Sequence, residues 1–300
     1  MSLTNTDPVK IYGFPKFKWP RIDNPKIKFP IADNIEAIKI AEQKALKQIQ
    51  GVIKNEEPNI AGLIIEPIQG EGGDNHFRKE FFQALQKLTS ENDILFIVDE
   101  VQTGMGVTGK VWAHQYFDIK PDIVCFGKKS QICGILAGSR LDEVNDHVFK
   151  QSSRINSTWG GNIVDAVRLE KYIEIIEEQN LLQNAEIQGK YLLSELLKLQ
   201  NLFPDIISNV RGLGLLVAVD LPNKKYRNKV LDLLFQKHFI FLPCGQLSIR
   251  FRPMLDINKE QIDLAINAWN QVLDELTHQK QNTSLVQNNI QTGTHGPVCI

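Results

Sequence analysis

The chain has 300 residues, with 34 Lys and Arg against 35 Asp and Glu, so its formal net charge is −1. This balance argues against a basic nucleic-acid-binding face or a polybasic membrane anchor, and no run of about 20 apolar residues predicts a transmembrane helix. The hydrophobic fraction of 42% suffices for a large core, and the length predicts about two domains. The cysteines lie far apart without a CxxC pair, which indicates free thiols in a reducing cytoplasm.

The predicted elements begin after an opening rich in proline. Residues 1–33 contain Pro8, Pro15, Pro20, Pro25 and Pro30, which predict an extended segment. Helical periodicity follows from Asp33, and we expect Gly51 to end that helix. Short apolar runs predict buried strands at 60–65, 94–98, 122–126 and 134–138, with a helix at 77–92. Strands separated by helical stretches favour an α/β fold, with helices on both faces of a sheet.

A smaller α+β domain is predicted after Gly161. Its predicted helices span 162–179, 183–201, 226–237 and 259–276, and its predicted strands span 213–221, 239–242 and 248–252. The end of the chain is rich in Gln, Asn and Thr and is expected to be disordered. The predicted organisation is a large domain over 1–162, a small domain over 163–277 and a disordered tail over 278–300.

Charged side chains directly follow three of the predicted strands. Glu66 follows the first, Asp99 the second, and Lys128 and Lys129 the third. In an open α/β sheet, ligands bind outside the carboxyl ends of the strands. A lysine there can hold pyridoxal phosphate as a Schiff base while an acidic partner keeps the ring nitrogen protonated. Adjacent lysines point in different directions, so only one of Lys128 and Lys129 can face the cofactor.

Four motifs, in this order, resemble those of class III pyridoxal-phosphate-dependent aminotransferases. They are the stretches 65–73, 98–104, 126–129 and 157–162, which read IEPIQGEGG, VDEVQTG, FGKK and STWGGN. The resemblance runs from about Ser2 to about Leu276. It implies a fold-type I structure, with an α/β/α large domain and a smaller α+β C-terminal domain. Within the class, the stretch 128–134, Trp159 and the opening 3–6 are most similar to the lysine 6-aminotransferases.

The resemblance implies roles around the cofactor for four residues. Lys128 matches the lysine that holds pyridoxal phosphate and moves a proton, and Asp99 matches the carboxylate paired with the pyridine nitrogen. Gln102 matches the side chain near the ring hydroxyl. Thr158 matches the residue that reaches the cofactor phosphate from the neighbouring subunit.

Two further residues are implied to bind substrate. Arg250 matches the arginine that meets the carboxylate of the keto acid, and Glu71 matches the acidic residue that pairs with this arginine when the amine donor is bound. A glutamate that masks the arginine and can move away lets one pocket accept a neutral and an anionic substrate end.

The implied activity is transfer of the ε-amino group of L-lysine to 2-oxoglutarate, which gives 2-aminoadipate 6-semialdehyde and glutamate. The implied enzyme is a cytoplasmic homodimer without a metal, a nucleic-acid partner or a membrane partner. The alternatives are another class III ω-aminotransferase, using ornithine, 4-aminobutyrate or a diamine, and a non-catalytic fragment or partner subunit.

The resemblance also implies an N-terminally truncated chain, because Met1 matches a position inside the large domain of the family. We therefore expect impaired activity. The helix-start loop that cradles the cofactor phosphate, the aromatic residue that stacks on the ring and the arginine for the α-carboxylate of lysine are not assigned.

Overall fold

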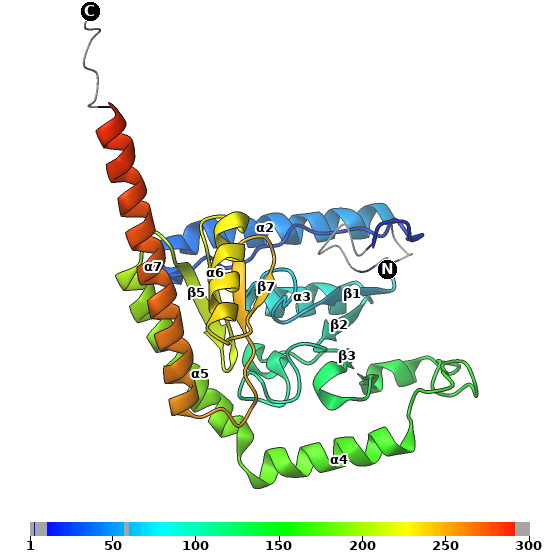
Figure 1. Cartoon of the computed structure of the whole chain (residues 1–300). Coiled ribbons are helices and arrows are strands. Elements are labelled where there is room, and N and C mark those ends of the chain that lie inside the picture. Colours follow the sequence, from blue (N-terminus) through cyan, green and yellow to red (C-terminus); the bar gives the residue numbers. More distant parts are fainter. Residues whose placement is uncertain (1–2, 4–10, 57–59, 292–300) are drawn as a thin grey trace, which may run out of the picture.

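The computed structural model describes residue 3 and residues 11–56 and 60–291, with side chains described as far as His278 (Figure 1). Residues 14–30 form no regular helix or strand, as the proline spacing predicts. Helix α2 (Ile31–Glu56) follows, and beyond it the chain builds two sheets of four strands each. Among the residues described, no helix combines the length and apolarity needed to cross a membrane.

The first sheet contains β1 (Gly62–Ile65), β2 (Leu95–Asp99), β3 (Ile123–Phe126) and β4 (Gly134–Ala137), in that order. β1, β2 and β3 are parallel, and β4 runs antiparallel to β3. α3 (Lys79–Glu91) packs on β2, and α2 packs on α3. The four strands and the helix predicted from apolar periodicity are therefore confirmed, each within two residues.

Helical cover of this sheet lies on one face. Phe96 and Val98 of β2 are buried in a core with Phe81 and Phe82 of α3, because alternate strand side chains point to opposite faces. Ile64 pairs with Ile97 on the other face and is 38% exposed. Parallel strands with helical cover agree with the α/β organisation that the sequence predicts for the large domain.

The second sheet contains β5 (Ser208–Leu213), β6 (Leu216–Asp220), β8 (Ser248–Phe251) and β7 (Leu242–Cys244), all antiparallel and in the spatial order β5-β6-β8-β7. Helices α5 (Leu181–Leu202), α6 (Lys224–Gln236) and α7 (Lys259–Gln291) share a core with one face of this sheet. Trp269 of α7 is fully buried in the core that they share. This is the smaller α+β unit that the sequence predicts.

The two units meet at a small apolar cluster. It contains Ile68 from the loop after β1, Val107, Ala185 of α5, and Leu215 and Leu216 at the β5–β6 turn. The Leu215 N–H donates to the Val107 carbonyl at 2.8 Å. The loop after β1 is therefore held between the sheets.

Three sequence predictions differ from the structure. Gly51 lies inside α2 rather than at its end, because Ile49 and Ile53 are both buried and this packing offsets the helix penalty of glycine, about 1 kcal/mol. The strand predicted at 213–221 is β6 and begins only at Leu216, because the chain reverses at Gly214; the preceding strand β5 is not predicted. α7 continues past His278, where a disordered tail is predicted, to Gln291; residues 292–300 lie outside the described residues.

Candidate active site

The carboxyl ends of β1, β2 and β3 lie beside one another, because the three strands are parallel (Figure 1). Glu66 directly follows β1, Asp99 ends β2, and Lys128 lies two residues beyond β3. The structure therefore brings these three side chains to one edge of the sheet. Ligands bind at this edge in open α/β sheets.

The Glu66 carboxyl group titrates near neutral pH. Burial raises its pKa to about 7; the Gly70 N–H, 3.1 Å from Oε2, opposes this shift, the charge of Asp99 adds to it, and Lys128 opposes it. Such a group can hold or release a proton at neutral pH. The sequence placed Glu66 at the edge, but its pKa depends on burial that only the fold shows.

Asp99 is half-buried, and its Oδ1 accepts a hydrogen bond from the Val101 N–H at 3.0 Å. Cys125 lies opposite Asp99 on β3, and burial, together with the Asp99 charge, raises the pKa of that thiol. A carboxylate fixed at a strand end can keep a nearby ring nitrogen protonated.

The two adjacent lysines point in different directions. The Lys129 amine donates to the main-chain oxygen of Gln102, and burial, followed by the charge of Arg252, lowers its pKa to about 8. Lys128 is exposed, and its amine makes no hydrogen bond or ion pair within the described ranges. Its φ of +50° lies in the left-handed region, which few residues other than glycine adopt. Lys128 is therefore the lysine of the pair with an available amine.

A buried carboxylate holds the segment that carries Gln102. Glu100, 1% exposed, accepts hydrogen bonds from the Ala113 N–H at 3.0 Å, the His114 N–H at 2.7 Å and the Thr103 hydroxyl. The sequence analysis assigned Glu100 no role, although the acidic pair after an apolar strand was a visible signal.

The Gln102 side chain lies directly against Gly70. A Cβ atom at position 70 would be 2.5 Å from Oε1 of Gln102. A larger residue at 70 would therefore displace the amide.

Glu71 and Arg250 form an ion pair across the junction of the two units. The Arg250 Nη1 atom lies 3.0 Å from Oε2 of Glu71, and the side chains are 14% and 38% exposed respectively. Glu71 lies in the loop after β1, whereas Arg250 lies on β8. The structure thus brings together two residues that the sequence analysis paired only through the family resemblance.

Thr158 lies apart from this edge. It belongs to an exposed stretch, residues 152–161, that precedes α4 (Ile163–Glu178). This stretch and α4 project from the body of the molecule (Figure 1). The structure does not bring Thr158 next to Lys128 or Asp99 of the same chain.

These residues fit pyridoxal phosphate. An available amine at Lys128, a carboxylate at Asp99 and an amide at Gln102 surround one sheet edge, where Gly70 leaves room for the amide. An amine can bond to the aldehyde carbon, a carboxylate can accept a hydrogen bond from the protonated ring nitrogen, and an amide can hydrogen-bond with the ring hydroxyl.

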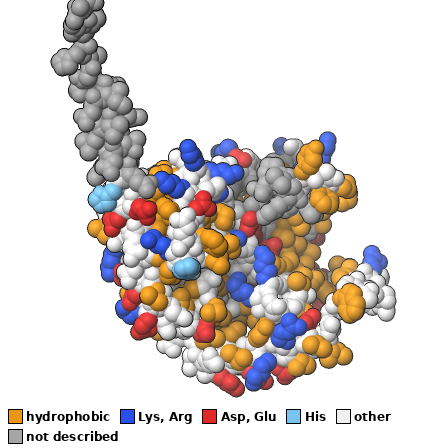
Figure 2. All heavy atoms as spheres, viewed as in Figure 1, with side chains coloured by type: hydrophobic (Ala, Val, Ile, Leu, Met, Phe, Trp, Pro, Cys, Tyr) orange, Lys and Arg blue, Asp and Glu red, His pale blue; other side chains and the backbone are white. Residues whose placement is uncertain are grey.

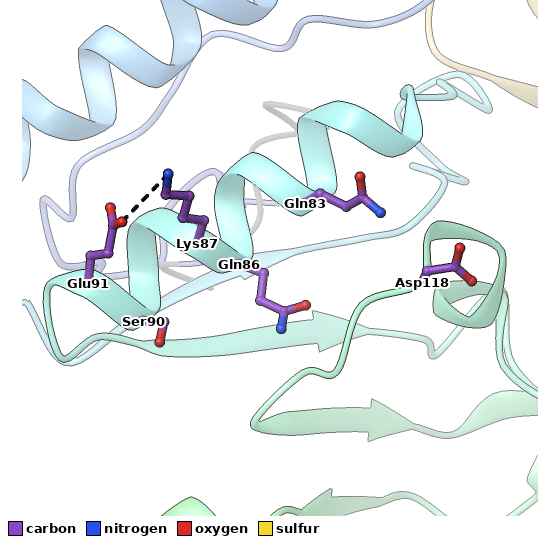
Figure 3. Close-up of a pocket in the computed structure, with 6 residues that line it drawn as sticks. All are labelled: Gln83, Gln86, Lys87, Ser90, Glu91 and Asp118. Carbon is purple, nitrogen blue, oxygen red and sulfur yellow. Dashed lines mark ion pairs between the residues drawn. The ribbon is translucent and has the colours of Figure 1, made fainter.

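A separate hollow lies on α3, away from this edge. It is lined by Gln83, Gln86, Lys87, Ser90, Glu91 and Asp118 (Figure 3). None of the residues described above lines it. Its lining is polar and partly satisfied internally, since Lys87 pairs with Glu91 at 3.8 Å, so the sheet edge remains the candidate site.

The sequence and the fold of the chain are both similar to those of known proteins. The family model described as "Aminotransferase class-III" matches residues 1–273. An L-lysine-epsilon aminotransferase of Streptomyces clavuligerus is 49% identical over 269 residues, which cover 89% of this chain and 59% of that protein. A 4-aminobutyrate aminotransferase of Dictyostelium discoideum is 37% identical over 278 residues, or 92% of this chain and 55% of that protein.

A solved structure gives the same similarity in three dimensions. The lysine aminotransferase from M. tuberculosis in the internal aldimine form superposes with a TM-score of 0.88 at 46% identity, covering 91% of this chain and 62% of that chain. The present chain thus spans about three-fifths of the length of these lysine-specific relatives.

Proposed function

The chain belongs to the class III aminotransferase family, and on that premise we propose that it carries the reactive lysine of an enzyme that moves the ε-amino group of L-lysine to 2-oxoglutarate. The products are 2-aminoadipate 6-semialdehyde and glutamate. The observation that carries the proposal is the single sheet edge shared by the Lys128 amine and the Asp99 carboxylate. The donor is proposed from the relatives named for lysine, at 46–49% identity against 37% for the 4-aminobutyrate enzyme.

Three residues act on the cofactor in this proposal. Pyridoxal phosphate, when bound, supplies an aldehyde that accepts the amino group and a ring that draws electrons from the adjacent carbon. The Lys128 Nζ atom binds the cofactor and then carries the proton that leaves the substrate carbon. The Asp99 carboxylate holds the proton on the ring nitrogen, and the Gln102 amide orients the ring hydroxyl.

Glu71 and Arg250 choose between the two substrates. With the ion pair closed, Arg250 presents no net positive charge, which suits the amine donor. When Glu71 moves aside, the guanidinium can bind a carboxylate of 2-oxoglutarate with two parallel hydrogen bonds. Glu71 is the more exposed partner of the pair, which favours its being the residue that moves.

We further propose a cytoplasmic homodimer. Exposed apolar side chains gather on the projecting part of the chain, where hydrophobic groups are visible in Figure 2: Val144, Phe149, Ile155, Trp159, Ile163, Val164 and Val167 are each more than half exposed. Exposed apolar patches of this kind mark protein interfaces, and a second copy would bring its Thr158 to the cofactor phosphate. The described cysteines are free, as expected in a reducing compartment.

The experiment is a comparison of amine donors. The complete chain is incubated with pyridoxal phosphate, 2-oxoglutarate and either L-lysine, L-ornithine or 4-aminobutyrate, and the glutamate formed is measured. We expect the highest rate with L-lysine and none for Lys128→Ala. Preference for another donor would contradict the choice of substrate, and absence of turnover with every donor would support a non-catalytic fragment.

A further inference from the structure

The Glu71–Arg250 pair depends on how the loop after β1 docks on the second sheet. Glu71 belongs to residues 69–75, here called the switch loop, and Arg250 belongs to β8. The two residues lie far apart in the sequence, so the chain between them does not fix their separation. Something in the fold must therefore set the distance between the loop and the strand.

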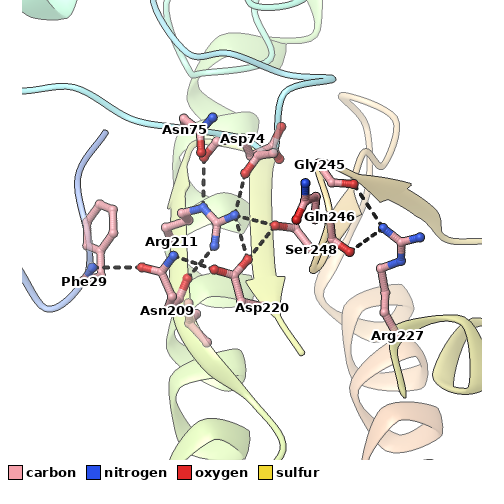
Figure 4. A network of polar contacts seen from close by, with 12 residues as sticks. Phe29, Asp74, Asn75, Asn209, Arg211, Asp220, Arg227, Gly245, Gln246 and Ser248 are labelled. Carbon is pink, nitrogen blue, oxygen red and sulfur yellow. Dashed lines mark hydrogen bonds and ion pairs between the residues drawn. The ribbon is translucent and has the colours of Figure 1, made fainter. Parts of the chain in front are cut away.

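Arg211 of β5 lies at this junction and is 3% exposed. On one side its Nε donates to the Asp74 carbonyl at 2.9 Å, and its Nη2 donates to the Gly73 carbonyl (Figure 4). On the other side the same Nη2 donates to Ser248 Oγ at 2.8 Å and lies 2.9 Å from Asp220 Oδ1. One guanidinium thus joins the switch loop to β6 and β8.

The contacts of Arg211 flank both members of the ion pair. Ser248 lies two residues before Arg250 on β8, so their side chains share one face of the strand. Gly73 lies two residues after Glu71. Arg211 therefore binds the Gly73 carbonyl and the Ser248 hydroxyl, each two residues from a member of the ion pair.

Two other contacts hold the same loop but do not replace Arg211. The Gly245 N–H donates to the Glu71 carbonyl at 2.9 Å, and a Cβ at this glycine, whose φ is +52°, would be 2.9 Å from the Gly72 carbonyl. Arg252 pairs with the fully buried Asp74 side chain. Both contacts join the loop to residues beside β8, but neither reaches Asp220 or Ser248, and Arg211 alone of the three also binds Asp220 of β6.

We propose that Arg211 is a positioning residue for substrate choice: it holds the switch loop so that Glu71 masks Arg250. The proposal rests on the function proposed above for this ion pair. Without the guanidinium fork, the loop carbonyls lose two donors, Glu71 leaves Arg250 more often, and Arg250 becomes more available to anions. Lysine at 211 would keep the buried charge beside Asp220 but could not supply the planar fork.

The test measures how readily Arg250 reacts with phenylglyoxal, which modifies guanidinium groups that are not paired with a carboxylate. The complete chain is used without cofactor, and the modified residue is located by peptide mass and fragmentation. We expect Arg211→Lys and Glu71→Gln each to speed modification of Arg250 about two- to fivefold, the range expected on loss of a partly exposed ion pair. We expect Arg211→Met also to speed the modification of Arg250. Urea unfolding curves verify that each variant is folded.

The double variant Arg211→Lys, Glu71→Gln decides whether Arg211 acts through Glu71. If it does, the double variant reacts no faster than Glu71→Gln alone, because there is no mask left to misplace. Rates that multiply, or an unchanged rate in Arg211→Lys, would overturn the proposal. Arg140→Lys is the matched control: this arginine binds Asp93 and Asp122 at the opposite end of the first sheet, and its replacement should leave Arg250 unchanged.

This readout needs neither cofactor nor turnover. If the donor comparison fails, the reactivity of Arg250 can still be measured. If the effects of the two substitutions on that reactivity multiply, the result of the donor comparison is unaffected. The two proposals can therefore fail separately.

Discussion

Glu66 and Asp99 end neighbouring parallel strands, yet they meet different surroundings. Asp99 is held by a backbone N–H two residues along the chain, whereas burial dominates at Glu66 and raises its pKa to about 7 from 4.5. Position at a strand end was visible in the sequence for both. The difference between them depends on neighbours that the fold supplies.

Glu66 makes stability depend on pH in a defined window. Below pH 4.5 the Glu66 carboxyl is protonated in both the folded and the unfolded chain. Between pH 4.5 and about 7 it ionises in the unfolded chain but keeps its proton in the folded chain. The free energy of unfolding therefore falls as the pH rises through this range. Glu66→Gln removes this titration. At about pH 8 its free energy of unfolding should exceed that of the unmodified chain by about 1–3 kcal/mol, after allowance for partial exposure.

Urea unfolding at a series of pH values measures this effect. The two stability curves should converge below pH 4.5. Glu80→Gln, at an exposed glutamate of α3, serves as control and should follow the unmodified chain throughout. If the stability curve of Glu66→Gln stays parallel to that of the unmodified chain at every pH, Glu66 ionises in the folded chain as it does in the unfolded chain.

At the residue scale, the sequence predicts which charged groups lie at the ends of strands, but not the hydrogen bonds that hold the neighbouring groups. Lys128 and Asp99 were identified from strand ends and the family motifs. Glu100 and Lys129 adjoin them in sequence, but their roles depend on hydrogen bonds that the fold forms. Glu100 accepts from the N–H groups of Ala113 and His114, and Lys129 donates to the Gln102 carbonyl. Nothing in a single sequence distinguishes a lysine that binds a carbonyl from one that faces solvent.

At the scale of elements, apolar periodicity predicted all four strands of the first sheet. The errors occurred where long-range packing decided the outcome. Gly51 continues α2 because residues on either side are buried, whereas β5 was missed because it forms by pairing with β6. Its residues 208–213 read SNVRGL, and polar residues and a glycine interrupt the apolar positions, so no local signal predicts this strand.

At the same scale, none of the residues of helix α4 is buried. Ile163 and Val167 lie one turn apart on the same face and are 80% and 60% exposed. If a second copy covers this face, Ile163→Asp with Val167→Asp should convert a dimer to a monomer, because burying unpaired carboxylates is costly.

Sedimentation velocity tests this prediction. The unmodified chain should sediment as a dimer and the α4 double variant as a monomer of the same folded content. Leu264→Asp changes a 61% exposed apolar residue of α7 and should leave the dimer intact. A monomeric unmodified chain, or a dimer that survives the α4 changes, would contradict the assignment of this face.

At the scale of the whole molecule, the candidate site is a junction between two sheets. Asp99 and Lys128 come from the first, Arg250 comes from the second, and Arg211 ties them through partners 137 and 138 positions away in the sequence. Family motifs predicted the residues of the site, whereas the network that aligns them has no local sequence signature. The chain spans 59% of the Streptomyces relative, so the activity of the complete protein is what experiment must establish.

The central claim is that Lys128, not Lys129, forms the bond to pyridoxal phosphate, and covalent mapping tests it most directly. The chain is mixed with pyridoxal phosphate, the bond is fixed by borohydride reduction, and the labelled lysine is located by peptide mass and fragmentation. We predict label at Lys128 in the unmodified chain and in Lys129→Met, and none at position 128 or 129 in Lys128→Ala. Label on Lys129, or no label at either lysine, would contradict the account.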